Sequence, residues 1–455
     1  MNFKDIEKDI FNYVCNLAVE MTLNLLENLD IELQENRDKS RYRSKDKHKT
    51  TIKTLYGNVE YSRRYYYDYK EGKCCFLLDD FLETKKGKGL LSANVKELIA
   101  SACIDMSYQD AADFISETTG LSVSKTGTWN TVQELGSQAE KYQEQKISEQ
   151  EEYNGKDVKV LFEETDGVWL KCQNPDKTKG KSFETKLVTI YEGWSELQPN
   201  RLVNKTVIGG ISRARELKKK TEAIINSIYN IDEIKLRVIN GDGAGWIDQM
   251  SDGDVVYQLD RFHVLKYINT YIKDKKVRRK IRKALKEKKV DKMIDIIETY
   301  MNSIDGIDEK AYSDAGKIYS YFTNNKDYIL RYNERADIIV PDPDDGIIYK
   351  NMGVQENQNC SLISMRMKHR RMRWSESGSS NLIRLICAKE NNELKKIIDF
   401  VDFQIVDAEE KIEKAISAAD IPVKVGTDEF FEKYRVSIPL LDTCSSTSKA
   451  IRGLI

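Results

Sequence analysis

The stretch from about residue 157 to residue 268 restricts the possible folds more than any other part of the sequence. It contains apolar runs of strand length, separated by turns and by one helical segment at 211–230. The runs are DVKVLFEETDGVWLKCQ, interpreted as two strands joined near Asp166-Gly167, then FETKLVTIYEGW, EIKLRVING and DVVYQL. A short helix is expected at 244–250, and another follows the last run. Strands and helices in this order predict a mixed α/β sheet.

Three acidic residues occupy comparable positions relative to these predicted elements. Asp166 ends the first strand, Asp242 follows the fourth between two glycines, and Glu356 opens a helix after a long helical stretch. The succession of elements matches a ribonuclease H-like core, in which the first and fourth strands are neighbours and the final helix packs over their edge. We therefore predict that the three carboxylates meet at one point.

Carboxylates brought together repel one another, and a divalent cation removes that penalty. Mg²⁺ suits such a site because it takes oxygen ligands and leaves positions for phosphate and water, and Mn²⁺ would fit as well. Two such ions can stabilise the attacking and leaving oxygens of a phosphodiester displacement. The glycines beside Asp242 would leave room for a nucleic-acid backbone.

Each acidic residue also has an alternative. Asp166 and Asp242 are of a type common in turns, and Glu163 or Glu164 could replace Asp166 as the ligand. Glu376 in WSESG lies close enough in sequence to Glu356 to be the third acid instead. The sequence alone leaves these alternatives open.

The region before residue 157 predicts binding to DNA. An alternating pattern around Tyr56-Gly57-Asn58 predicts a β-hairpin, whose second strand interleaves Arg63 and Arg64 with tyrosines. Such a strand face suits solvent as well as nucleic acid. SYQDAADFISETTGLSVSKTGTWNTVQELG predicts a helix-turn-helix with Lys125 and Thr126 at the start of its second helix, although any helical hairpin gives this pattern.

Basic residues are also concentrated after the predicted sheet. The run KDKKVRRKIRKALKEKKVDK lies in a helical stretch and predicts either a solvated or a phosphate-facing surface. A second basic group follows Glu356 within a few helical turns, and it predicts phosphate contacts beside the acidic site. Its members are Arg366, Lys368, Arg370, Arg371 and Arg373.

Composition excludes several classes of protein. The 73 Lys and Arg residues nearly cancel the 74 Asp and Glu residues, so the net charge gives no global sign of a polyanion partner. Eight cysteines without C-x-x-C or Cys/His spacing argue against a disulfide framework or a zinc site. No apolar stretch approaches the roughly 18 residues of a membrane span. We therefore expect a cytoplasmic protein without a membrane partner, associated with the nucleoid when bound to DNA.

An ordered set of motifs covers most of the chain from about residue 50 onward. The set is YGNVEYSRRYYY, MSYQDAADFISETTGLSVSKTGTWN, EETDGVWLKCQ, VINGDGAGWI, LDRFHVLKYI, GVQENQNCSLISMRMKHRRMRWSESGSSNLIRL and VSIPLLDT. By these motifs the chain resembles the Mutator-like DDE transposases of bacterial insertion sequences, in the group first known from a Listeria-type element. The ordered set is specific, whereas no single motif is.

The resemblance implies a role for each residue. Asp166, Asp242 and Glu356 would be the metal-binding triad, and Asp260 with His263 would match the family's D-x-x-H element. His263 would then contact a phosphate, support the metal ligands or be structural. Members of the family cut at the ends of their own element and join the 3′-hydroxyl to target DNA. The implied partner is double-stranded DNA, at the element ends and in the target, with a homodimer or higher oligomer assembled on it.

The predicted organisation is multidomain α+β, with a helical insertion interrupting the core. The predicted parts are N-terminal helices and a basic linker (1–50), a DNA-binding region (51–150), the first part of the ribonuclease H-like core (157–263), the helical insertion (264–340), the final part of the core with Glu356 (341–400) and a C-terminal tail (401–455).

Two other functions fit the same residues. One is a catalytically silent DNA-binding relative, and the other is a nuclease or resolvase that hydrolyses DNA without joining it.

Overall fold

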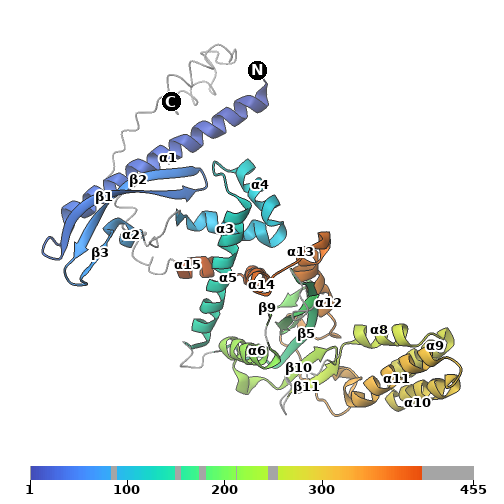
Figure 1. Ribbon diagram of the computed structural model, residues 1–455. Coiled ribbons are helices and arrows are strands. Elements are labelled where there is room, and N and C mark those ends of the chain that lie inside the picture. Colours follow the sequence, from blue (N-terminus) through green and yellow to red (C-terminus); the bar gives the residue numbers. More distant parts are fainter. Residues whose placement is uncertain are drawn as a thin grey trace, which may run out of the picture. The chain divides into compact units, whose positions relative to one another are not determined.

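The structure is a computed structural model that describes residues 2–82, 90–148, 155–173, 181–211, 213–243 and 255–401. The described chain divides into two compact units, and most of their helices and several of their strands are labelled in Figure 1. One unit holds the described parts of residues 1–95 and 116–122, and the other holds residues 96–115 and 123–401. No helix in the described ranges is both long and apolar enough to cross a membrane.

The first unit is a long helix packed on a β-hairpin. Its elements are α1 (Phe3–Asn36), β1 (Tyr42–Thr54), β2 (Gly57–Asp68), β3 (Lys73–Cys75), α2 (Leu77–Phe81) and β4 (Leu90–Leu91), and its sheet has the order β3-β2-β1-β4. The predicted hairpin is confirmed, because β1 and β2 pair antiparallel up to Thr54 and Gly57 at the turn. Gly57 has a φ of +137°, which only glycine adopts without strain. Residues 42–50, predicted as part of a linker, lie in β1.

Three helices follow the hairpin, namely α3 (Ala93–Asp105), α4 (Tyr108–Thr118) and α5 (Lys125–Ser148). The last two occupy the positions predicted for the helix-turn-helix. The Ser124 hydroxyl accepts from Gly127 N at 3.1 Å and so caps the start of α5. The buried Thr128 hydroxyl donates to Tyr108 O at 3.1 Å, which ties the start of α5 to the start of α4. Binding of DNA by this pair stays a prediction.

A five-stranded mixed sheet forms the centre of the second unit. In sequence order its strands are β5 (Val160–Lys171), β6 (Ser182–Tyr191), β9 (Thr206–Gly210), β10 (Leu236–Gly241) and β11 (Val255–Leu259), and their spatial order is β11-β10-β5-β6-β9. β5, β6 and β9 pair antiparallel, whereas β10 and β11 are parallel to β5. The first and fourth long strands, β5 and β10, are therefore neighbours, as predicted.

The interpretation of residues 157–173 as two strands is wrong. β5 is one strand of twelve residues that passes through Asp166-Gly167 without a turn, because β6 pairs with it from Phe162 to Lys171. Asp and Gly favour turns in isolation, but a continuous partner strand overrides that preference. The third antiparallel strand is instead β9, which the sequence analysis missed. The helix expected at 244–250 lies outside the described residues.

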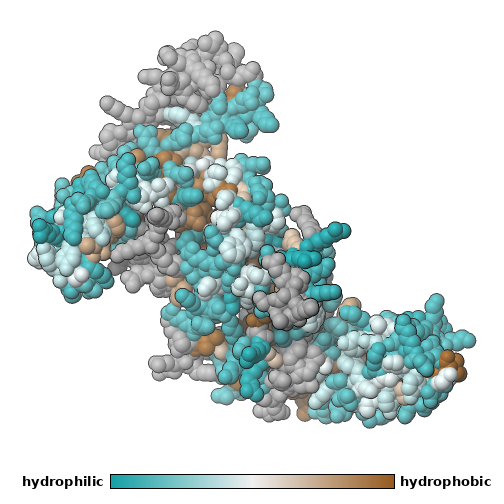
Figure 2. Space-filling model, viewed as in Figure 1, coloured by the Kyte–Doolittle hydropathy of each residue, from teal (hydrophilic) through white to brown (hydrophobic). Residues whose placement is uncertain are grey.

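Helices cover the sheet and extend from its β11 edge. α6 (Ala214–Ile228) precedes β10, and four helices follow β11: α8 (Arg261–Tyr271), α9 (Lys275–Lys286), α10 (Val290–Ile304) and α11 (Glu309–Asn324). They share one apolar core with the sheet, from Leu161 and Ile239 to Ile281 and Phe322. The basic run lies on α9, which buries Ile281 and Leu285 and exposes its Lys and Arg side chains except Arg278, which is half-buried. Figure 2 shows a largely hydrophilic surface over these helices.

The chain returns to the sheet after this helical insertion. The returning elements are β12 (Ile347–Ile348), which forms a small sheet with β7 (Gly193–Ser195) and β8 (Leu202–Val203), then α12 (Gln355–Gln358), a π-helical turn (Asn359–Ser364), α13 (Met365–Met367), α14 (Glu376–Glu390) and α15 (Leu394–Val401). α14 packs against α5 and β9. α14 lies close to α5 at Gly136, where an added Cβ would lie 2.4 Å from the Cβ of Asn381.

We expect Gly136→Ala to destabilise the second unit, because a methyl group there overlaps backbone and side-chain atoms of Asn381. Overpacking of this kind costs about 1–3 kcal/mol. Gly316→Ala on α11 is the matched control, since its Cβ would meet only Met301 Sδ at 3.9 Å. Thermal unfolding should show a melting temperature lower by several degrees for Gly136→Ala and unchanged or higher for Gly316→Ala. Equal effects of the two variants would contradict this packing.

Candidate functional site

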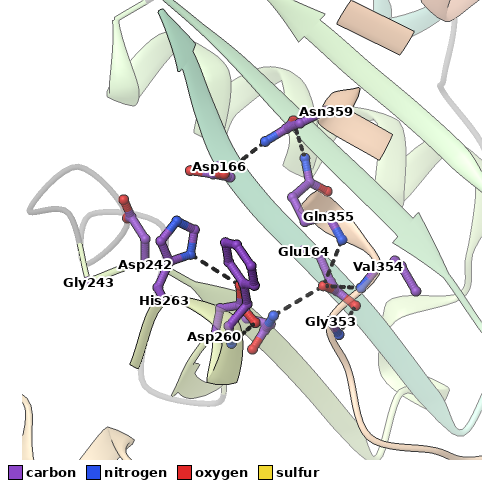
Figure 3. A network of polar contacts seen from close by, with 12 residues as sticks. Glu164, Asp166, Asp242, Gly243, Asp260, His263, Gly353, Val354, Gln355 and Asn359 are labelled. Carbon is purple, nitrogen blue, oxygen red and sulfur yellow. Dashed lines mark hydrogen bonds and ion pairs between the residues drawn. The ribbon is translucent and has the colours of Figure 1, made fainter. Parts of the chain in front are cut away.

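Acidic residues gather where the parallel part of the sheet ends. β5 pairs with β10 only as far as the Glu164–Asn240 pair, so Asp166 and Asp242 each lie two residues beyond it, at the same level. Asp260 follows the Gly241–Leu259 pair and is therefore level with Asp242 on the other side. The prediction that Asp166 ends a strand is thus wrong, since it lies within β5, but it lies at the end of the parallel pairing. Figure 3 shows these residues together.

The structure brings Asp166 and Glu356 together with His263. Ligand atoms of these three side chains all lie within 4.8 Å of one another, which makes them the candidate metal-binding group of the described residues. Asp166 and His263 are buried, whereas Glu356 is exposed. Asp242 is half-buried and stands beside His263, outside this group of three (Figure 3). Two members of the predicted triad therefore meet in the group, and His263 is the third member in place of Asp242.

The electrostatics of Asp166 fit a cation site. Burial raises the pKa of this carboxyl to about 6, although His263 and the Gly167 N–H favour its charged form, and the charges of Asp242 and Glu356 raise the pKa further. Its two oxygens accept hydrogen bonds from Gly167 N at 2.7 Å and from Asn359 Nδ2 at 2.8 Å. Its orientation is thereby fixed. A divalent cation would offset the repulsion among these acids, so the residues present fit such an ion.

His263 is oriented by Asp260. Asp260 caps the N-terminus of α8 by accepting from Phe262 N at 3.2 Å, and its second oxygen lies 3.1 Å from His263 Nδ1. Nδ1 is thus engaged, which leaves Nε2 for a metal ion or a phosphate oxygen. Burial opposes a charge on His263, but Asp260, Asp166 and Asp242 more than offset that effect, so its pKa lies above the usual value.

A buried carboxylate that the sequence analysis did not assign as a support holds the helix of Glu356 in place. Glu164 on β5 accepts hydrogen bonds from three consecutive backbone N–H groups, those of Gly353, Val354 and Gln355, at 2.9, 2.9 and 3.2 Å. α12 has no capping side chain of its own, so Glu164 satisfies its first N–H groups from the central strand. The Tyr191 hydroxyl donates to Glu164 as well, at 2.6 Å. Burial raises the pKa of Glu164, although these hydrogen bonds favour its charged form.

The neighbouring polar side chains connect this support to Asp166. Gln355 donates from Nε2 to Leu187 O at 3.0 Å and to Asn359 Oδ1 at 3.2 Å. Asn359 in turn donates to Asp166, as described above. One chain of hydrogen bonds therefore links the first turn of α12 to the carboxylate on β5 (Figure 3).

Over residues 1–403 the sequence matches the family described as Uncharacterised protein family (UPF0236). The chain belongs to this family. A UPF0236 protein of Caldanaerobacter subterraneus subsp. tengcongensis is 25% identical over 440 residues, which cover 94% of this chain and 87% of the relative, and its name joins eleven loci. A second UPF0236 protein of that strain is 25% identical over 360 residues, which cover 77% of this chain and 70% of the relative.

One solved structure with some similarity is the Drosophila P element transposase strand transfer complex. It has a TM-score of 0.24 and 10% sequence identity, and the alignment covers 73% of this UPF0236 protein and 88% of that chain. A similarity of this size does not bear on the fold or the function.

The alternative acids have other partners in the UPF0236 protein. Glu163 forms an ion pair with Arg237, which also pairs with Glu222, and Glu164 supports α12. Glu376 begins α14, exposed, and is outside the group formed by Asp166, His263 and Glu356 among the described residues. The geometry therefore favours Asp166 and Glu356 over these three alternatives.

The predicted nucleic-acid contacts divide into paired, exposed and buried side chains. Arg63 pairs with Asp79, and Arg64 pairs with Asp30 at 2.5 Å, so both hold the hairpin to its own helices instead of facing solvent. The remaining predicted contacts are Lys125, Thr126, Lys368 and Arg371, which are exposed, and Arg366, which is buried. The side chain of Arg370 lies outside the described part of the chain. Arg63 and Arg64 are thus engaged within the fold and Arg366 is enclosed by it, and contact of these three residues with phosphates stays a prediction.

We expect Mg²⁺ or Mn²⁺ to raise the melting temperature of the UPF0236 protein at about pH 8, and this effect to vanish at about pH 5. The pKa of Asp166 rises from 3.8 to about 6 on folding. Ionised Asp166 therefore costs stability as pH rises through about 6, and a bound cation offsets that cost. Protonation below this pH removes the ligand. Scanning fluorimetry across the pH range measures the shift, and an equal shift at both pH values would contradict the site.

Glu356→Gln tests the third acid against its alternative. The substitution keeps the size of the side chain but removes the charge, so the metal-dependent shift at about pH 8 should fall by more than half. Glu376→Gln is the matched control and should keep the full shift, since Glu376 is outside the cluster. Loss of the shift in Glu376→Gln alone would reverse the assignment.

We expect Glu164→Gln to lower the free energy of unfolding by about 1–3 kcal/mol, because its amide group would face donors that the carboxylate now accepts from. Urea unfolding measures the change. Glu233→Gln, at an exposed acid before β10, is the control and should change stability by less than about 0.5 kcal/mol. A neutral effect of Glu164→Gln would mean that the first turn of α12 does not depend on this carboxylate.

Proposed function

We propose that this UPF0236 protein is a Mutator-like DDE transposase whose second unit is a ribonuclease H-like core with a helical insertion. The order of the sheet supports this, since three antiparallel strands followed by two parallel ones suit a ribonuclease H-like core, although β5 and β9 differ from the strands expected. The insertion between β11 and α12 supports it too, since α8 to α11 fill the range predicted for it.

The observation that carries the proposal is the meeting of Asp166 and Glu356 with His263 at the end of the parallel strands, with Asp242 beside them. The group combines residues from β5, α8 and α12, which lie far apart in sequence. Burial raises the pKa of Asp166, and the charges of Asp242 and Glu356 raise it further. Acids with a pKa perturbed in this way are concentrated at functional sites. Such acids fit a site that binds divalent cations and acts on phosphate esters.

The residues of the site have separable roles in this proposal. Asp166 and Glu356 would hold Mg²⁺ or Mn²⁺, with Asp242, which stands beside their group, as a further ligand. The ion when bound supplies a charge that stabilises the attacking and leaving oxygens of a phosphodiester. His263, turned by Asp260, offers Nε2 to a non-bridging phosphate oxygen of the bound DNA. Asn359 and the Gly167 N–H keep the carboxylate of Asp166 in one orientation.

Two displacements at phosphorus make up the reaction. In the first, a water oxygen bonds to phosphorus and loses a proton, and the 3′-oxygen leaves and takes one up as a free 3′-hydroxyl. In the second, that 3′-oxygen bonds to a phosphorus of target DNA, its proton is released, and the target's own 3′-oxygen leaves and takes one up. Both steps use the same acids, because the bond broken and the bond formed are of one kind.

Double-stranded DNA is the proposed partner, at the element ends and in the target. Exposed Lys125 and Thr126 at the N-terminus of α5 suit contacts to a DNA groove and its phosphates. Pairing two ends requires at least two copies of the chain on DNA. The eleven loci joined in the name of one relative support mobility, because strand joining at new positions multiplies a sequence within one genome.

A nuclease or resolvase of the same fold is the second candidate, since the acidic group supports hydrolysis as well as joining. The two functions differ in the fate of the 3′-hydroxyl, which only a transposase attaches to a second DNA. A catalytically silent relative is the third candidate, and the meeting of Asp166 and Glu356 with His263 argues against it, because a relic would not need to keep these side chains together.

We expect purified protein with Mg²⁺ to join labelled DNA from the flanks of its gene to a target plasmid. Asp242→Asn should reduce joined product on the order of 100-fold or more, because it removes a charge that acts in the transition state. Asp232→Asn is the matched control, since Asp232 is an exposed acid before the opposite end of β10. Gel electrophoresis separates joined from cleaved product.

Each outcome of this assay selects one function. Cleavage without joining would favour the nuclease. Binding without any chemistry, in the wild type as well as in Asp242→Asn, would leave a DNA-binding relic. Equal activity of Asp242→Asn and the wild type would remove Asp242 from the site.

A further inference from the structure

A pocket of about 350 Å³ lies in the second unit at the start of α5, apart from the acidic group. Its walls come from the start of α4, the start of α5 and the segment before α14. That segment is attached to the end of β5, because Trp374 N donates to Lys171 O at 3.0 Å and Gln173 N donates to Trp374 O at 2.7 Å. The pocket is therefore built on the same strand that carries Asp166.

Arg366 is a buried cation of this pocket that lacks an acidic partner. It is 6% exposed, and none of the ion pairs among the described residues includes it. Its Nε donates to Cys103 O at 2.8 Å and its Nη1 to Met372 Sδ at 3.5 Å, while Nη2 has no hydrogen-bond partner. Asp105 and Asp110 act on this guanidinium through their charges without forming an ion pair. A buried guanidinium with an unpaired N–H group is costly unless a ligand completes its hydrogen bonds.

The other walls are aromatic and basic. The guanidinium lies 5.7 Å from the ring centre of Tyr108 and 5.3 Å from that of Trp374, and the hydroxyl of Tyr108 is also buried without a partner. Trp129 on α5 is 43% exposed and adds a third ring to the lining. Lys125 and Arg373 line the pocket with exposed side chains, and no Asp or Glu of the described residues does.

These features together fit one class of ligand. Three cations without a carboxylate favour an anion, and the aromatic walls favour a planar ring. A nucleotide has both. The volume is at the lower end of small-ligand sites, which are roughly 300–1,000 Å³, so the pocket admits a single unit and not a duplex. A nucleotide of duplex DNA reaches such a pocket only when its base leaves the stack.

We propose that this pocket binds one unstacked nucleotide of the DNA strand, with the base against Trp129 and the phosphate toward Arg366, Lys125 and Arg373. The inference rests on the proposed function, because it takes DNA as the partner. It places the phosphate contact of Arg366 in this pocket, inside the fold, whereas the sequence predicts that contact beside the acidic site. It also gives a function to an arginine that lies beside Trp374 and Tyr108 and has an unpaired N–H group.

The test compares two labelled duplexes of one sequence, of which one carries a single unpaired nucleotide. Fluorescence anisotropy should show that the wild type binds the duplex with the unpaired nucleotide about tenfold more tightly, in the range of base stacking on an aromatic side chain. Trp129→Ala and Arg366→Met should lose this preference and keep their affinity for the paired duplex. Trp169→Ala, at an exposed tryptophan outside the pocket, is the control and should keep the preference.

Controls distinguish a variant that does not bind from one that does not fold, and the binding results distinguish failure of the pocket from failure of the proposed function. Thermal unfolding checks that Arg366→Met is folded, and exposed Trp129 provides a variant that does not disturb the core. A wild type that binds paired duplex without preference overturns the pocket alone, whereas one that binds neither duplex overturns the proposed function as well. Preference that persists in Trp129→Ala and Arg366→Met also overturns the pocket.

Competition with deoxynucleoside monophosphates and with inorganic phosphate completes the test. The monophosphates should abolish the preference, and inorganic phosphate at the same concentration should not. Equal competition by phosphate would make this a simple anion site and overturn the inference. Binding of free monophosphates by a protein with no preference between the duplexes would overturn the assignment to a DNA strand.

Discussion

The buried carboxylate of Glu164 is the contact on which the candidate site depends. It accepts from the backbone N–H groups of Gly353, Val354 and Gln355, which are the donors that the start of a helix leaves unpaired. Glu164 therefore fixes the start of α12 to the central strand β5, although Gly353 lies 189 residues further along the chain. Glu164 sets the position of the exposed Glu356 relative to Asp166, together with the hydrogen bonds of Gln355 and Asn359, since α12 has only one turn before the π-helical segment.

The two halves of the sheet contribute differently to the site. The antiparallel half extends β5 beyond the last pair with β10, so Asp166 has a partner strand on one side and an open edge on the other. The parallel half ends at that open edge and delivers Asp242 and Asp260 to the same level. His263 follows from the cap of α8, because an acid at Asp260 suits the helix start and also holds the ring. The location of the group is thus a consequence of strand register.

Register and burial explain what the sequence could predict and what it could not. Asp242 follows an apolar run, which places it near the end of a strand. Glu356 follows a break in the helical pattern, which places it near the start of a helix. Asp166 was placed at a turn because Asp-Gly favours one, whereas β6 keeps the chain extended through it. The strand of Arg63 and Arg64 has the basic and aromatic composition of a DNA-binding strand. Only the structure shows that these arginines form ion pairs with Asp79 and Asp30. The hydrogen bonds from the start of α12 to Glu164 could not be predicted, because the sequence shows only that this helix start lacks a capping side chain.

β5 also acts as a molecular ruler. Asp166 lies within β5, and Cys172 follows its last residue and pairs with Trp374 of the pocket wall through an isolated β-bridge. Six residues at about 3.3 Å each separate the two positions, so the acidic group and the pocket wall are roughly 20 Å apart. A strand paired along its length does not stretch. A DNA strand bound at the acidic group and in the pocket at the same time would have a fixed distance between the phosphodiester at the acidic group and the nucleotide in the pocket. That distance would not depend on the DNA sequence between them.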